Sequence, residues 1–68
     1  MLYLSPRPRL VKATIGNQAE ILLVMYPDSP RYEVRVYLAT IPHDHRTLVA
    51  TDNITEAEAI YRANATRL

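Results

Sequence analysis

Two histidines flank an aspartate at His43-Asp44-His45, where imidazole and carboxylate groups could bind a divalent metal or transfer a proton. A catalytic zinc ion needs three protein ligands that converge on one point, and three consecutive loop residues rarely do so. The segment follows Pro42 and is predicted to be a polar turn in which Asp44 caps nearby backbone amides. A metal site at His43 and His45 is therefore a remote hypothesis, and no cofactor is expected.

The other residues offer no basis for catalysis. Cysteine is absent, and the single glycine cannot build a phosphate-binding loop. Glu56 and Glu58 are paired carboxylates, but they stand where the first turn of a helix favours acidic residues. A chain of 68 residues also has difficulty enclosing a pocket of about 300 Å³ or more. We therefore expect neither an enzyme nor a catalytic residue.

Several basic residues are arranged as a nucleic-acid site would require. Three lie among the first twelve positions with no acidic residue, and two arginines share a face of a predicted strand with an aromatic ring on which a base could stack. The residues of such a site are Arg7, Arg9, Lys12, Arg31 and Arg35, with Tyr37 beside the last two. Glu33 stands between the two strand arginines, and the net charge of the chain is only +1. Nucleic-acid binding is therefore the alternative hypothesis.

Protein binding has the widest support. The five aromatic residues are all tyrosines, and arginine far outnumbers lysine, which is a composition typical of interfaces. The run Ile21 to Tyr26 has no polar face, so its strand is either covered on both sides or part of an interface. The predicted contact residues for a protein partner are Arg31, Glu33, Arg35 and Tyr37.

The elements that position these residues follow from periodicity and turn signals. Alternating or continuous apolar runs predict strands over residues 9–15, 20–26, 31–41 and 46–51, separated by turns at 16–17, 27–30 and 42–45. Thr55-Glu-Ala-Glu58 matches a capping box, which predicts a helix from Thr55 to about residue 67. The expected core residues are Val34, Val36, Leu38, Ile60 and Tyr61.

The order β-β-β-β-α predicts a single α+β domain over residues 1–68, with a four-stranded, mostly antiparallel sheet and one C-terminal helix packed on one face. Residues 1–8 are expected to be an extended segment or an extra edge strand. A domain of this size without disulfides is only marginally stable alone, so a partner or a homodimer would help to stabilise it.

The N-terminal residues do not have the pattern of a signal peptide, and no apolar run is long enough to cross a membrane, which favours a cytoplasmic protein. We expect a small protein-binding module, such as an inhibitor or an accessory subunit of a larger complex. Inhibitors encoded by phages and mobile elements, anti-CRISPR proteins among them, are often this compact, and the analogy rests on size alone.

Overall fold

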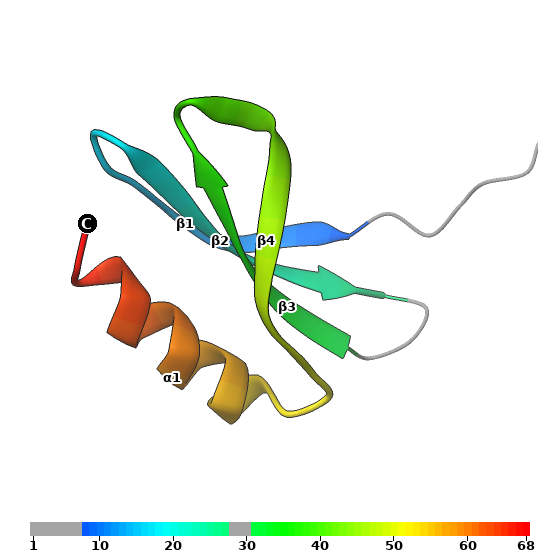
Figure 1. Cartoon of the computed structure of the whole chain (residues 1–68). Helices are drawn as coiled ribbons and strands as arrows, with labels where there is room; N and C mark the ends of the chain where they lie inside the picture. The colour runs from blue at the N-terminus through cyan, green and yellow to red at the C-terminus, as the bar shows by residue number, and fades with distance from the viewer. Residues whose placement is uncertain (1–7, 28–30) are drawn as a thin grey trace, which may run out of the picture.

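The computed structural model describes residues 8–27 and 31–68, and it shows one antiparallel sheet followed by one helix (Figure 1). The strands are β1 (Arg9–Ile15), β2 (Ala19–Tyr26), β3 (Arg31–Leu38) and β4 (Ile41–Thr51), and the helix is α1 (Ile54–Ala65). The strand order in the sheet is β1-β2-β3-β4, with every pairing antiparallel. The predicted α+β fold, with its β-β-β-β-α order and the helix on one face, is therefore confirmed.

Two of the predicted features fall outside the described residues. The predicted N-terminal segment 1–8 lies outside them except for Pro8, and so does most of the predicted turn at 27–30. Arg7 belongs to the first of these segments, so no position is assigned to it.

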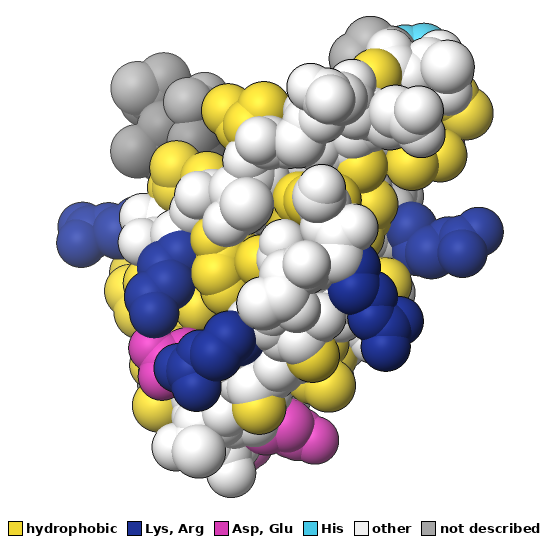
Figure 2. Space-filling view, turned by 90° about the vertical axis from the view of Figure 1, so that its left-hand side faces the viewer, with side chains coloured by type: hydrophobic (Ala, Val, Ile, Leu, Met, Phe, Trp, Pro, Cys, Tyr) yellow, Lys and Arg dark blue, Asp and Glu magenta, His cyan; other side chains and the backbone are white. Residues whose placement is uncertain are grey.

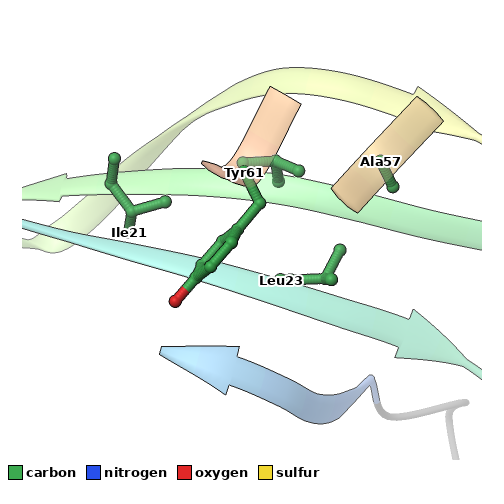
Figure 3. Close-up of a cluster of buried hydrophobic side chains, with 5 residues drawn as sticks. Ile21, Leu23, Ala57 and Tyr61 are labelled. Carbon is green, nitrogen blue, oxygen red and sulfur yellow. The ribbon is translucent and has the colours of Figure 1, made fainter. Parts of the chain in front are cut away.

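The hydrophobic core lies between α1 and the two central strands. Ile21 and Leu23 of β2 pack with Val34 of β3 against Ala57 and Tyr61 of the helix (Figure 3). Leu23 and Val34 are fully buried and directly opposite each other in the ladder, so they form the centre of this layer. The predictions for Val34 and Tyr61 are confirmed.

The predicted core residues at the margin divide into two kinds. Val36 and Ile60 are partly buried against the core, whereas Leu38 is 49% exposed, so its prediction as a core residue was wrong. Leu38 is exposed because the helix is shorter than the β3–β4 hairpin. The 12 residues of α1 span about 18 Å, whereas the 11 residues of β4 span about 37 Å when extended. The end of the β3–β4 hairpin therefore projects beyond the helix, as Figure 1 shows.

The turn between β3 and β4 lies earlier than predicted. Ala39 and Thr40 form the turn, and residues 42–45 belong to β4. Pro42 misled the prediction, because proline is tolerated in an edge strand such as β4. The backbone amide of Ala39 donates a hydrogen bond to the carbonyl oxygen of Gln18, at 2.8 Å, which joins this turn to the β1–β2 turn.

The helix begins at Ile54, one residue before its predicted start, and a different residue caps it. The side chain of Asn53 accepts hydrogen bonds from the backbone amides of Thr55 and Glu56, at 2.9 and 3.3 Å. The predicted capping box at Thr55 was therefore wrong. Asparagine is at least as good an N-cap as threonine, and moving the cap to residue 53 places Ile54 beside the core.

Candidate binding surface

The face of the sheet opposite α1, here called the open face, carries the residues predicted to bind a partner. The β2–β3 register pairs Leu23 with Val34 on the helix side, so the alternate residues of both strands point to the other side. The open face consists of Glu20, Leu22, Val24 and Tyr26 of β2, and Arg31, Glu33, Arg35 and Tyr37 of β3. By register it also includes Leu10, Ala13 and Ile15 of β1.

A polar cluster crosses the middle of the open face. The Arg35 guanidinium donates one hydrogen bond from Nε to Oε1 of Glu33, at 3.1 Å, and a second from Nη2 to the hydroxyl of Tyr26, at 2.5 Å. On the open face, the Val24–Glu33 pair lies between the Tyr26–Arg31 pair and the Leu22–Arg35 pair. The side chains of Tyr26 and Arg35 therefore meet above Val24. This arrangement explains why Val24 is only 4% exposed although no helix covers it.

The charges of this cluster largely compensate one another. The side chains of Glu33 and Arg35 are 12% and 15% exposed, and Arg31 reaches Glu33 at 3.7 Å from a more exposed position. Burial acts to lower the pKa of Arg35, but its interactions with the neighbouring tyrosines and with the carboxylate of Glu33 outweigh it, so the pKa is raised. Arg35 therefore stays charged, and it is already engaged by its neighbours within the chain. Among the four predicted contact residues, Arg31 presents the most accessible charge.

Tyr37 lies at the other end of the β3 row, beside His45 of β4. The two rings lie 5.2 Å apart between centroids, at an interplanar angle of 42°. The neighbours of Tyr37 across the sheet are Glu20 in β2 and then Ile15 in β1, so these three residues form one row of the open face across three strands. The row combines an aromatic ring, a carboxylate and an exposed apolar side chain.

The histidines lie in β4 and not in the predicted turn. His43 and His45 are both exposed, and the backbone amide of His45 donates a hydrogen bond to Oδ1 of Asp44, at 2.8 Å. Within residues 8–27 and 31–68 the structure contains no group of three or more side chains that could hold a metal ion.

The structure separates the basic residues that the nucleic-acid hypothesis combined. Lys12 points to the helix side, where its Nζ lies 3.6 Å from Oε2 of Glu58, and Arg9 pairs in register with Met25, which also belongs to that side. Arg31 and Arg35 belong to the open face. In the view of Figure 2 the basic side chains lie on two opposite sides of the molecule, with hydrophobic and uncharged surface between them.

The orientation of β1 is opposite to what a core strand requires. Its polar residues Lys12 and Thr14 face the helix, where the hydroxyls of Thr14 and Tyr61 lie 2.5 Å apart in a hydrogen bond. Its apolar residues Leu10 and Ile15 face away from the helix and are 62% and 75% exposed. The β1–β2 register shifts between Leu10 and Lys12, which leaves Val11 without a partner in β2.

Three open grooves lie at the end of the molecule where both hairpin turns meet, and the smallest of the three, of about 190 Å³, is lined by Ile15, Glu20 and Tyr37 of the open face together with residues beside both turns. One groove, of about 350 Å³, runs along the projecting β3–β4 hairpin. Its apolar lining comes from Val36, Leu38, Ile41 and Leu48, and its polar lining from Asp44, His45 and Arg46. The second, of about 800 Å³, lies between the two turns and the C-terminal residues Arg67 and Leu68.

Sequence reasoning identified the β3 row of the open face but did not name Tyr26, Leu10 or Ile15 as contact residues. Tyr26 was counted in an apolar run, and only the β2–β3 register shows that it reaches Arg35. Leu10 and Ile15 belong to a strand whose alternation was recognised, but alternation alone does not say which face meets the helix.

Within the part of the chain that the structure describes, no helix is long and apolar enough to cross a membrane. Comparisons of the chain with protein-family models, with curated proteins and with solved structures find no match.

Proposed function

We propose that this chain is a small, non-enzymatic protein-binding module whose contact surface is the open face together with β1. In this role it acts on a larger protein complex as an inhibitor or an accessory subunit, in the cytoplasm. The single observation that supports the proposal best is the inverted orientation of β1. A strand that turns Lys12 toward the helix and Leu10 and Ile15 toward solvent gains little burial free energy from these apolar residues until another molecule covers them.

The small core gives the same proposal a second support. Among the described residues, only six hydrophobic side chains are buried, and only Leu23 and Val34 of these are large and fully enclosed. A chain with so little internal burial is only marginally stable, and a bound partner stabilises the folded state by mass action.

The surface chemistry favours a protein over a nucleic acid. The polar cluster of Glu33, Arg35 and Tyr26 is internally compensated, so the open face offers tyrosine rings and apolar side chains, with Arg31 and Glu20 as its charges outside the cluster. Interfaces between proteins are built from such residues. A nucleic-acid site requires basic residues that converge on one phosphate backbone of the nucleic acid. Here Lys12 and Arg31 lie on opposite faces of the sheet.

The test is a tagged pull-down from a lysate of the organism that encodes the chain, with and without nuclease, followed by mass spectrometry. The chain is compared with an Ile15→Ser, Tyr37→Ala variant, which alters the exposed row of the open face. An Ala59→Ser, Ala63→Ser variant changes exposed helix positions and serves as the control.

We expect a stoichiometric protein that survives nuclease and moderate salt, is lost with the open-face variant and is retained with the helix variant. Retention that disappears with nuclease would support nucleic acid instead. Equal retention by both variants would place the contact elsewhere on the chain.

A further inference from the structure

β1 forms one edge of the sheet, and no described strand lies on its outer side. We infer that the outer edge of β1 binds an extended segment of the protein partner that alternates acidic and apolar residues and adds to the sheet as a fifth strand. The inference rests on the proposed protein-binding function and identifies the part of the partner that is held.

The backbone of β1 determines what kind of group can bind there. Alternate residues of an edge strand direct their amide and carbonyl groups away from the sheet, and only another extended chain matches their spacing. Strand addition of this kind gains affinity from backbone hydrogen bonds and specificity from alternate side chains.

The opposite edge is less suited to the same role. The β3–β4 register is irregular at two places, between Val34 and Arg35 and between Val36 and Leu38, and β4 also contains Pro42, which has no amide proton to donate. Irregular register and proline both protect an edge from pairing. β1 has one irregularity, between Leu10 and Lys12, and its ladder with β2 is regular from Lys12 to Ile15.

The charge of β1 decides between an acidic partner and a second copy of this chain. The first acidic residue of the sequence is Glu20, so β1 contributes Arg9 and Lys12 with no acidic residue of its own. Glu58 of the helix compensates one of these charges. Pairing β1 with its own copy would place four cations on two adjacent strands, and like charges across a ladder are destabilising. A strand with carboxylates beside Arg9 and Lys12 is favoured instead.

The two faces of β1 then give the pattern of the partner strand. By register, Arg9 and Lys12 belong to the helix side, and Leu10, Ala13 and Ile15 belong to the open face. A strand added beside β1 directs successive side chains to these two sides in turn. Its acidic residues would therefore lie beside the cations and its apolar residues beside Leu10 and Ile15, where both charge and burial are complementary.

The test uses the full chain labelled with ¹⁵N and a blocked synthetic peptide that alternates valine and glutamate over seven residues, the length of β1. We expect chemical-shift changes and slowed amide exchange concentrated in β1, and weaker binding of a peptide with lysine in place of glutamate. Arg9→Glu should weaken binding of the acidic peptide about fivefold, because it replaces a cross-strand attraction with a repulsion. Arg46→Glu makes the same charge change on the opposite edge and should leave the affinity unchanged.

Shift changes confined to β4 or α1, no response at millimolar peptide, or equal binding of both peptides would overturn the assignment. Self-association of the chain through β1, seen by sedimentation and by slowed exchange of the β1 amides without peptide, would also overturn it. The lysate pull-down separates this inference from the function on which it rests. A protein retained equally by the original chain and by Arg9→Glu would overturn only the role of β1, whereas no retained protein would overturn the proposed function.

Discussion

The hydrogen bond between Tyr61 and Thr14 ties the edge strand β1 to the helix, and removing it tests how β1 is held. The two hydroxyl oxygens lie 2.5 Å apart, and Tyr61 is only 8% exposed. Tyr61→Phe deletes the phenolic hydroxyl and keeps the ring in the core. A net contribution of about 1 kcal/mol is typical of such a bond, since folding exchanges it for hydrogen bonds to water.

The expected shift in melting temperature follows from the length of the chain. With an unfolding entropy of about 2.1 cal/mol/K per residue over 68 residues, a loss of about 1 kcal/mol lowers the melting temperature by about 7 °C. The free energy of unfolding is measured by urea denaturation at constant m-value, and thermal unfolding is followed by circular dichroism.

Tyr32→Phe is the matched control for this substitution. Tyr32 is partly buried against the same core, and no hydrogen bond of its hydroxyl to a described side chain is found. Its replacement should change the free energy of unfolding by less than about 0.5 kcal/mol. A cycle of Tyr61→Phe, Thr14→Val and the double variant should give a coupling energy of about 1 kcal/mol. Equal effects of the two tyrosine substitutions, together with a coupling energy near zero, would refute the role of this bond.

Three further predictions concern the core, the cap and the polar cluster. Leu23→Ala should lower the free energy of unfolding by about 2–5 kcal/mol, enough to abolish the cooperative transition, whereas truncation of its half-buried neighbour Leu22 should cost clearly less in the same urea titration. Asn53→Ala should lower the free energy of unfolding by about 1 kcal/mol and Thr55→Ala by less, as measured by thermal denaturation. The reverse order would show that Thr55, and not Asn53, caps the helix. Glu33→Gln should cost about 1 kcal/mol by removing a charged acceptor of Arg35, and an unchanged urea midpoint would contradict this.

Residue alternation predicted most of this fold correctly. The strand at residues 9–15 was located to the residue, because Lys12 and Thr14 alternate with apolar residues. The turn between β3 and β4 was misplaced because Ala39 and Thr40 have no strong turn signal, and a hydrogen bond from the neighbouring hairpin turn holds that position. The cap was misplaced because two good capping residues, at 53 and 55, compete, and core packing of Ile54 favours the first.

The candidate surface was predicted only in part, because it depends on register. The row of Arg31, Glu33, Arg35 and Tyr37 was evident from the alternation of one strand. The contact between this row and Tyr26 depends on the register of β2 against β3, which no local sequence pattern predicts. The functional assignment of the row stays a prediction.

In β1, the residues that stabilise the fold and the residues proposed to bind a partner lie on opposite faces of the strand. Lys12 and Thr14 hold β1 to the helix through Glu58 and Tyr61, so they contribute to the stability of the fold. Leu10 and Ile15 are mostly exposed, so replacing them should leave the free energy of unfolding nearly unchanged. In a strand with the usual orientation, apolar residues serve the core, and a substitution that weakens binding also weakens the fold. Here the two sets occupy opposite faces, so substitutions at Leu10 and Ile15 should weaken the proposed binding and leave the fold intact.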